Sequence, residues 1–309
     1  MNITKIESHR AIGYLCAIAA TAIWSGNIIV ARGLNTSIEP VSLAFWRWVV
    51  AVVCVLPFGL KAIIVEWKAI KRHIIYLLIT AVFGVTLFNT LIYKAGQTTS
   101  AINLSLISLT FPVFVIVASR LCLNETITTK KVCGIAVVLF GILMLLTGGD
   151  FDKLRHLNLA SGDGWMLLAA MSFAIYSLLL KFKPKELSVW SMQLSTFALG
   201  LLILTPAYLW TSHGQPNTSW EPTTLLSVIY IGVCASLVAF TMWNQAIINI
   251  GPVPSGMLYY SLPLFSGGLA FVFLDEPIGL IHLESALLII AGIMLANSRR
   301  TRFWRGEQA

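Results

Sequence analysis

The residues "PVFVIVASRLCLNE" at positions 112–125 begin with a proline inside an apolar run and end with a glutamate. Residues 263–276 read "PLFSGGLAFVFLDE" and show the same proline and the same acid 151 positions later. The correspondence continues beyond this stretch, because Gly141 and Gly292 are separated by the same offset. We therefore predict that the chain contains two copies of one structural unit.

The composition indicates whether the chain is surrounded by water or by lipid. Of its 309 residues, 57% are hydrophobic and only 11% are charged, and the mean hydropathy is +0.83. Soluble domains carry about 25% charged residues. A large soluble α-helical protein is therefore excluded, because too few polar side chains are present to cover a surface in water. The composition predicts a protein that lies in the lipid bilayer.

Apolar runs of membrane-spanning length divide the chain into two equal sets. A transmembrane helix needs about 20 mostly apolar residues. Ten such runs are present, at 11–31, 40–60, 73–93, 98–119, 130–147, 163–182, 188–210, 223–247, 252–274 and 279–297. Five belong to a first unit, residues 1–147, and five to a second unit, residues 163–300. The polar segment 148–162 links the units, and a basic tail covers residues 301–309.

The odd number of runs in each unit decides how the two units are related. A chain that crosses the membrane five times starts its second copy from the opposite side. The sequence "AIWS" at 22–25 returns as "AIYS" at 174–177, each in the first run of its unit. We therefore predict an all-α membrane protein with ten transmembrane helices in two inverted five-helix repeats. This arrangement is typical of secondary transporters that work by alternating access.

The distribution of basic residues predicts the orientation in the membrane. With the N-terminus placed in the cytoplasm, the segments on the other side hold only Arg32, Lys94, Lys153 and Arg155. The remaining Lys and Arg lie almost wholly in cytoplasmic segments, as the positive-inside rule requires. Both termini are therefore predicted to be cytoplasmic. The net charge of +8 follows from this pattern and does not indicate nucleic-acid binding.

No motif for a metal, a cofactor or ATP is present in the sequence. The five cysteines form no CxxC pair and lie in or beside apolar runs, as small buried side chains do. No GxxxxGK[ST] motif occurs, so we expect no direct use of ATP. No group of acids, histidines or serine–base pairs lies at one depth, and we therefore expect neither catalytic residues nor cofactors.

The ordered motifs resemble those of a known family. The duplicated unit, the Pro–Glu–Gly spacing in each copy and "FWR" at 45–47 are similar to the EamA branch of the drug/metabolite transporter superfamily. The resemblance implies a metabolite exporter of the bacterial inner membrane, with amino acids among the possible solutes. It implies a small-molecule metabolite and the lipid bilayer as partners. The oligomeric state is either a monomer or a homodimer. The second unit departs from the first, because Pro277 follows Glu276 and Gln193 lies near the place equivalent to Arg47.

Polar and aromatic side chains within the runs are the candidate substrate-binding residues. An amide that faces lipid without a partner costs several kcal/mol, so these groups should face the interior. In one interpretation, these side chains form an aromatic, hydrogen-bonding pocket for an amphipathic solute. In the other, they form hydrogen bonds between helices and belts of aromatic residues at the membrane interfaces. The set comprises Trp24, Asn27, Thr86, Asn89, Tyr93, Tyr176, Trp243, Asn244 and Tyr259.

Small residues and prolines mark one face of the fourth run and one face of the ninth. Ser108 and Pro112 lie on the first face, and Tyr259 and Pro263 on the second. Small residues allow close helix packing in lipid, whereas a proline frees carbonyls that can line a cavity. Because the two runs are equivalent in the repeat, we expect the faces to meet. Ser108, Pro112 and Pro263 are therefore added to the candidate substrate-binding residues.

Three charged residues are candidates for coupling or gating. Arg47 lies inside a run, where it either snorkels outward or faces the bundle and pairs with an acid. Glu125 and Glu276 follow Asn124 and Asp275, which we expect to cap helices. An acid in the first turn then stabilises the helix dipole, and proton coupling is the alternative role.

The sequence therefore predicts a secondary active or facilitative transporter. We expect it to export small metabolites, such as amino acids or related amphipathic compounds, by alternating access. A membrane-embedded enzyme that acts on a lipid or isoprenoid is the alternative, and a channel or scaffold is a third hypothesis.

Overall fold

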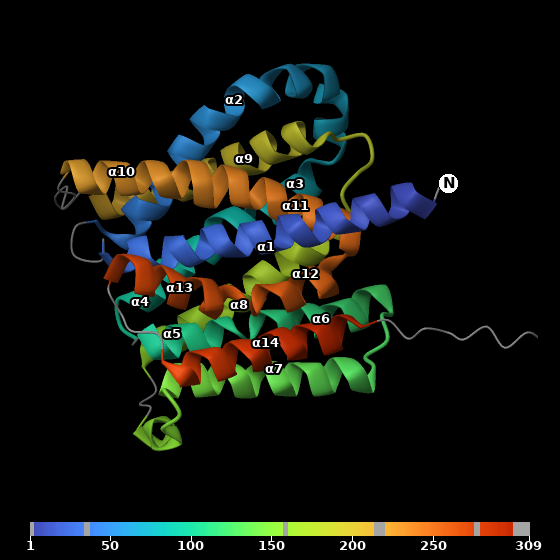
Figure 1. Cartoon of the computed structure of the whole chain (residues 1–309). Helices are drawn as coiled ribbons and strands as arrows, with labels where there is room; N and C mark the ends of the chain where they lie inside the picture. The colour runs from blue at the N-terminus through green and yellow to red at the C-terminus, as the bar shows by residue number, and fades with distance from the viewer. Residues whose placement is uncertain are drawn as a thin grey trace, which may run out of the picture.

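The computed structural model describes residues 3–33, 38–99, 101–156, 160–212, 220–274 and 279–298. These residues form helices joined by short connections, and none of them lies in a strand. Figure 1 shows most of the long helices lying side by side along one common direction, with α2 inclined to them. The prediction of an all-helical protein is confirmed for this part of the chain.

The helices of the two predicted units follow one another in the same order. The first unit contains α1 (Ile3–Gly33), α2 (Pro40–Arg72), α3 (Ile74–Ala81), the π-helix η1 (Val82–Leu87), α4 (Phe88–Gly96), α5 (Ala101–Ser108), α6 (Phe111–Leu123) and α7 (Thr129–Thr147). A 3-10 helix, η2 (Phe151–His156), follows. The second unit contains α8 (Ser161–Lys181), α9 (Val189–Ser212), α10 (Pro222–Tyr230), the π-helix η3 (Ile231–Val238), α11 (Ala239–Ile250), α12 (Pro252–Tyr259), α13 (Leu262–Leu274) and α14 (Leu280–Asn297).

Eight helical segments of the described chain are long and apolar enough to cross a membrane. They are Pro40–Arg72, Ile74–Gly96, Leu106–Leu123, Thr129–Thr147, Ser161–Lys181, Val189–Thr211, Pro222–Ile250 and Leu280–Asn297. The two other predicted runs are also helical, as α1 and as the pair α12–α13. Pro40, Pro222 and Pro252 lie in the first turns of α2, α10 and α12. Proline is tolerated there because a backbone N–H in the first turn has no partner within the helix.

The third helix of each unit contains a π-helical segment that the sequence did not predict. Val82–Leu87 interrupts the first unit's third helix, and Ile231–Val238 interrupts the second unit's. A π-helix bonds each N–H to the carbonyl five residues back, and such segments are frequent at functional sites. The irregularity occurs at equivalent places in the two units.

The fourth helix of each unit is interrupted just before its proline. The predicted runs 98–119 and 252–274 therefore each contain two shorter helices. α5 ends at Ser108 before α6 begins at Phe111, and α12 ends at Tyr259 before α13 begins at Leu262. Pro112 and Pro263 are each the second residue of the helix that follows. A proline inside a helix lacks one backbone N–H donor, and its ring crowds the preceding turn. In the first turn of a new helix, that N–H has no helical partner and the ring has no preceding turn to crowd.

The connection between α6 and α7 corrects the predicted capping role of Asn124. Asn124 ends α6 in the left-handed conformation, with φ of 53°, rather than starting the next helix. Thr128 caps α7 instead, because its Oγ1 accepts a hydrogen bond of 3.3 Å from Lys131 N. Glu125 therefore lies between the two helices and not in a first turn.

The last helices of the two units, α7 and α14, run antiparallel in close contact. Cβ atoms added to Gly134 and Gly292 would each lie 2.7 Å from the carbonyl oxygen of the other residue. One added to Gly141 would lie 3.1 Å from the carbonyl oxygen of Ser285. Residue number rises along α7 as it falls along α14. Small residues allow the two backbones to approach this closely.

The second helices of the two units, α2 and α9, are also antiparallel. Phe45 stacks on Tyr208 with ring centroids 4.0 Å apart, and Phe58 stacks on Trp190 at 5.3 Å. Gly59 lies against Leu194, where an added Cβ would be 2.8 Å from the leucine Cβ. The units are therefore interleaved and not side by side.

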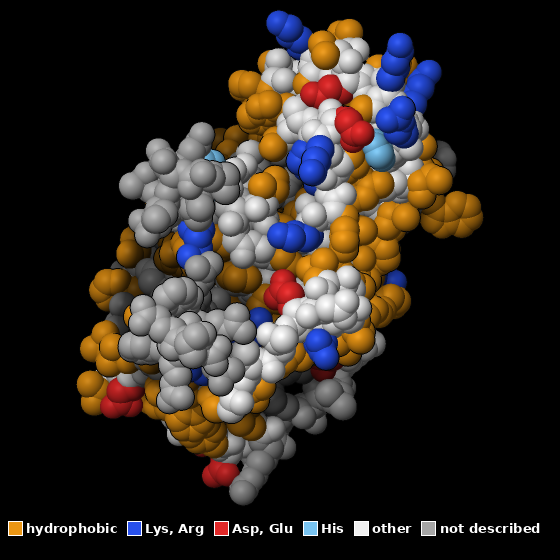
Figure 2. Space-filling model, turned by 90° about the vertical axis from the view of Figure 1, so that its right-hand side faces the viewer, with side chains coloured by type: hydrophobic (Ala, Val, Ile, Leu, Met, Phe, Trp, Pro, Cys, Tyr) orange, Lys and Arg blue, Asp and Glu red, His pale blue; other side chains and the backbone are white. Residues whose placement is uncertain are grey.

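The junctions between helices lie at two opposite ends of the bundle. The α2–α3, α6–α7 and α8–α9 junctions are at the end near the N-terminus, and the α4–α5 junction and η2 are at the other (Figure 1). Figure 2 looks onto the first end and shows Lys and Arg side chains spread over it, with hydrophobic side chains along its margins. Large apolar side chains are exposed at the surface, such as Val65 at 76% and Trp210 at 84%. Such a surface suits lipid and not water.

Candidate functional site

A cluster of aromatic rings fills the interior where the two units meet. Trp24 of α1 lies 5.3 Å from Phe173 of α8 and 5.3 Å from Trp243 of α11, measured between ring centroids. Its ring is also 6.3 Å from that of Tyr259 in α12. These distances fall within the range of favourable aromatic pairs. The structure thus brings together Trp24, Trp243 and Tyr259, three residues singled out in the sequence.

Further rings extend this cluster in both directions. Phe111 at the start of α6 lies 4.9 Å from Tyr259 and 5.0 Å from Phe173. Phe240 lies 5.7 Å from Trp24 and 5.4 Å from Trp48. We refer to these rings as the aromatic cluster, namely Trp24, Trp48, Phe111, Phe173, Tyr176, Phe240, Trp243 and Tyr259. All of its members are buried.

The polar ends of the cluster are bonded to α8 and α11. The Tyr176 hydroxyl donates to Asn244 Oδ1 at 2.7 Å, which joins two predicted site residues. The indole N–H of Trp243 donates to Ser177 Oγ at 3.0 Å. Gly84 of η1 lies against the Tyr176 ring, and an added Cβ would be only 2.2 Å from its Cδ2. The tyrosine is therefore held from two sides.

The π-helix η3 supplies carbonyl oxygens to side chains of three other helices. The Trp24 indole N–H and one terminal nitrogen of Arg47 both donate to the Ala235 carbonyl, at 2.9 and 3.0 Å. Gln193 of α9 donates to the neighbouring Leu237 carbonyl at 3.1 Å. A backbone carbonyl oxygen has two lone pairs and can accept a side-chain bond beside a backbone bond. The π-helix thus joins α1, α2 and α9.

The π-helix η1 plays the matching part in the other unit. The Trp48 indole N–H donates to the Val85 carbonyl at 3.1 Å, and Ser172 Oγ donates to the Phe83 carbonyl at 2.7 Å. Thr86 donates in turn to the Gly200 carbonyl of α9 at 3.1 Å. Thr86 therefore bonds to a neighbouring helix, as the packing interpretation of the sequence expected.

Arg47 faces the interior and is 1% exposed. Its Nε donates to Ser236 Oγ at 2.5 Å, and its other terminal nitrogen donates to the Tyr93 hydroxyl at 2.8 Å. The outward, snorkelling orientation is excluded. The ion pairs of the described chain involve Arg72, His73 and Lys131, and none of them involves Arg47.

The two small-residue faces predicted from the sequence meet between α6 and α12. A Cβ added to Gly256 would lie 3.7 Å from Pro112 Cα and 3.6 Å from Val115 Cβ. Ser108, Pro112 and Pro263 are all buried. The contact is ordinary van der Waals packing beside the aromatic cluster.

The remaining predicted site residues are not joined to one another. Asn89 is 2% exposed, and its Nδ2 has no hydrogen-bond partner in the described chain. Asn27 is half-buried, and its Oδ1 has no partner there either. Glu125 pairs with Lys131 at 3.7 Å at the end of the bundle, far from mid-helix. Glu276 lies outside the described residues.

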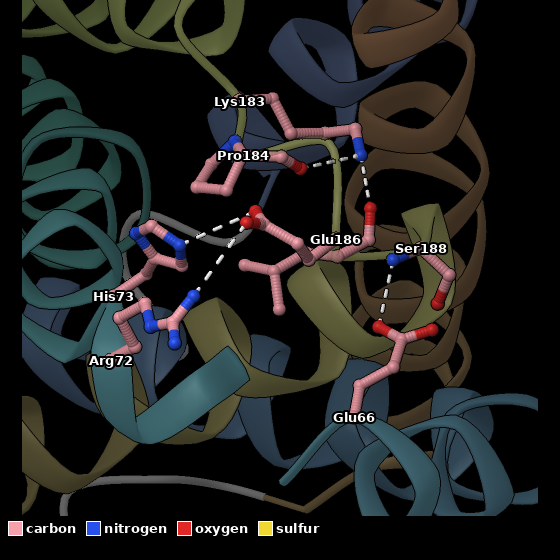
Figure 3. A network of polar contacts seen from close by, with 8 residues as sticks. Glu66, Arg72, His73, Lys183, Pro184, Glu186 and Ser188 are labelled. Carbon is pink, nitrogen blue, oxygen red and sulfur yellow. Dashed lines mark hydrogen bonds and ion pairs between the residues drawn. The ribbon is translucent and has the colours of Figure 1, made fainter. Parts of the chain in front are cut away.

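A network of polar contacts holds the α8–α9 junction against the ends of α2 and α3 (Figure 3). Glu66 accepts hydrogen bonds from Ser188 N at 2.8 Å and from the Ser191 hydroxyl. Glu186 lies 3.4 Å from His73 Nε2 and 4.0 Å from Arg72. Its own backbone amide, and then His73 and Arg72, hold the pKa of the Glu186 carboxyl below its ordinary value.

A small pocket of about 220 Å³ opens beside this network. Leu180, Lys181, Lys183, Lys185 and Ile248 line it. Burial lowers the pKa of the Lys183 amine, and the Glu66 carboxylate acts against that shift. Lys183 itself donates to the carbonyl oxygens of Pro184 and Leu187.

Several residues of the site were not predicted. Phe111, Phe173 and Phe240 are apolar residues in apolar runs, and nothing in the sequence separates them from lipid-facing ones. Ser177 and Ser236 accept bonds from Trp243 and Arg47 only because distant helices meet. Within the described ranges, no three His, Cys, Asp or Glu side chains come together in a way that could hold a metal ion.

Three relatives of known sequence cover between 61% and 90% of the chain. An uncharacterized transporter of Archaeoglobus fulgidus is 24% identical over 291 residues, which are 90% of this chain and 94% of that protein. The uncharacterized transporter YyaM of Bacillus subtilis is 22% identical over 84% of this chain and 85% of its own. A probable terminal-alkyne amino-acid exporter of Streptantibioticus cattleyicolor is 28% identical over 61% of each chain.

A protein of known crystal structure shares the fold. It superimposes with a TM-score of 0.72 at 16% identity and covers 93% of this chain and 97% of its own. The model of the EamA-like transporter family matches residues 11–147 and 160–298. This match confirms the resemblance noted from the sequence. The chain therefore belongs to the EamA-like transporter family.

Proposed function

We propose that this protein exports small amphipathic metabolites, with amino acids as the leading class, as a secondary active or facilitative carrier. The aromatic cluster, buried where the two units meet, carries this proposal. Rings at this position can hold the apolar part of a solute, while the polar groups around them fix its orientation. The amino-acid class is further supported by the probable terminal-alkyne amino-acid exporter among the relatives.

We propose that the solute moves by alternating access between two inverted repeats. The antiparallel pairs α7–α14 and α2–α9 support this arrangement, because a two-fold axis perpendicular to both helices relates each pair. The matching π-helices and interrupted fourth helices support it further. All ten helical runs would then cross the inner membrane, with both termini in the cytoplasm.

Counterflow in proteoliposomes tests the proposed transport. Purified protein would be reconstituted into vesicles loaded with an unlabelled amino acid, and uptake of the labelled compound would be followed. We expect exchange of one solute class with the parent and a large loss with Trp24→Ala. Trp210→Ala is the matched control, because that ring is 84% exposed and should leave exchange unchanged.

The alternative hypothesis of a membrane enzyme predicts a different result in the same proteoliposome experiment. An enzyme would consume a lipid or isoprenoid without moving a labelled solute across the bilayer. Product formation without counterflow would replace the transport proposal. Exchange that survives Trp24→Ala unchanged would remove the aromatic cluster from the proposed binding site.

Thiol labelling tests the proposed topology separately. The five native cysteines would first be replaced, because Cys122 and Cys133 are exposed. Single cysteines would then be introduced at Lys5 and at Asp152, which belong to α1 and η2. We expect a membrane-impermeant reagent added outside cells to label the Asp152 position and not the Lys5 position. Labelling of both positions from one side would contradict the inverted topology.

A further inference from the structure

The surroundings of Arg47 contain hydrogen-bond donors in excess of acceptors. The guanidinium has five N–H groups. Three of them donate to Ser236, Tyr93 and the Ala235 carbonyl. The other two, one on each terminal nitrogen, have no acceptor within the described chain. A buried charge in a membrane protein normally has an opposite charge or lines a functional path.

Two residues on one face of α4 add further unused donors. The Tyr93 hydroxyl accepts from Arg47, and among the described residues its own proton has no acceptor. Asn89 lies one helical turn before Tyr93 on α4, and its Nδ2 is buried without a partner. Residues four apart on an α-helix share a face. Ser236 offers no spare proton, because its hydroxyl donates to the Ile231 carbonyl.

The charge of Arg47 is not balanced by an acid of the described chain. Glu66, Glu125 and Glu186 are engaged at the end of the bundle. Asp163 is buried, but its Oδ2 accepts from Ala160 N and its Oδ1 from Thr99 at the start of α8. The corner formed by Arg47, Tyr93 and Asn89 is thus rich in donors and lacks an anion.

This corner adjoins the aromatic cluster directly. Arg47 and Trp24 donate to the same carbonyl oxygen, that of Ala235. The guanidinium carbon also lies 5.3 Å from the centroid of the Trp48 ring. A solute with a carboxylate beside an apolar group could therefore place one part in the corner and the other among the rings.

We infer that Arg47, with Tyr93 and Asn89 beside it, binds the carboxylate of the transported solute, while the aromatic cluster holds the apolar part. A guanidinium suits this task because its N–H groups match the two oxygens of a carboxylate. The inference rests on the proposed transport function and narrows it to carboxylates. It assigns Arg47 to substrate binding and not to gating alone.

Matched solutes test the inference on the full chain in detergent or nanodiscs. Phenylalanine, phenylalaninamide and phenethylamine share the ring and the amine, and only the first carries a carboxylate. We expect the parent to bind phenylalanine at least about tenfold more tightly than the other two, as loss of a charge-assisted bond implies. Equal binding of all three would overturn the inference.

Two variants separate recognition of the carboxylate from a structural role. Arg47→Gln keeps a polar side chain with N–H donors at this position but removes the charge. We expect it to weaken phenylalanine binding about tenfold or more and to leave binding of the amide nearly unchanged. Should this variant not fold, Tyr93→Phe removes one donor of the corner and should weaken only the carboxylate, by about threefold or more.

The control variant alters a partly buried hydrogen bond without changing any charge. Thr241→Val removes the hydrogen bonds from Thr241 to Gln193 Oε1 and to the Leu237 carbonyl, beside the same π-helix. We expect no change in the preference for the carboxylate. If Arg47→Gln and Tyr93→Phe weaken all three solutes equally, Arg47 is structural and the inference is wrong. If the parent binds and exchanges none of them or any other amino acid, the proposed function itself fails.

Discussion

Gly134 of α7 and Gly292 of α14 lie face to face, with no side chain between their backbones. A Cβ on Gly292 would be 2.6 Å from Val138 Cγ2 and 2.7 Å from the Gly134 carbonyl oxygen. Cβ atoms in folded proteins do not approach other atoms so closely. The last helices of the two units therefore pack through glycine.

Gly292→Val should force α7 and α14 apart. We expect a loss of about 1–3 kcal/mol in stability, the usual cost of overpacking, seen as a lower melting temperature in detergent. Gly164→Ala is the control, because nothing lies within 4 Å of its added Cβ. That control should be stabilised by about 0.5–1 kcal/mol, since alanine favours a helix more than glycine does. Equal stability of Gly292→Val and the parent would show that these helices do not pack closely.

Gly84→Ala should displace the Tyr176 ring and break its hydrogen bond to Asn244. The added Cβ would lie 2.2 Å from Tyr176 Cδ2, and no small shift relieves that overlap. We expect weaker solute binding together with a loss of about 1–3 kcal/mol in stability. Tyr176→Phe isolates the hydroxyl and should cost about 0.5–1.5 kcal/mol. Unchanged binding in both variants would place Tyr176 outside the binding site.

Glu66→Ala should loosen the start of α9. The Glu66 carboxylate accepts from Ser188 N and from the Ser191 hydroxyl, and so caps a helix from a different segment of the chain. We expect a stability loss of about 1 kcal/mol, as for other lost caps. Lys68→Ala is the control, because Lys68 is exposed on the same helix. A loss no greater than that of the control would contradict the capping role.

The Glu186 contacts should make stability depend on pH at the acid end. A carboxyl whose pKa is lowered on folding stabilises the folded state above its ordinary value of 4.5. This contribution is lost as the pH falls through the lowered value. We therefore expect Glu186→Gln to melt slightly below the parent near pH 7. The difference should vanish in acid, and a difference that persists there would contradict the assignment.

The sequence predicted where the helices lie because apolar length is a local property. The run 130–147 is matched by α7 at Thr129–Thr147, and Pro40 begins α2 as expected. The π-helices were not predicted, and the side chains that donate to their carbonyl oxygens come from distant parts of the sequence. Trp24, for example, donates to a carbonyl 211 positions along the chain.

The candidate site was predictable only in part, for the same reason. Asn244 and Tyr176 could be named as interior polar residues, but their mutual bond follows from the packing of α8 against α11. The position of Arg47 was open between outward and inward orientations, and its neighbours Ser236 and Tyr93 decided between them. Local patterns identify buried polar groups, and only the three-dimensional fold pairs them.

The π-helix η1 fixes the direction in which α4 presents its side chains. One residue advances an α-helix by about 100° around its axis. Deletion of a single residue within Val82–Leu87 would let the π-helix return to α-helical hydrogen bonding. The rest of α4 would then rotate and carry Asn89 and Tyr93 away from Arg47. Loss of one codon at this point would therefore take the donor-rich corner apart without substituting any of the residues that form it. With the proposed role of Arg47 in solute binding, the third helix would offer evolution a short route to new solute preferences within an unchanged scaffold.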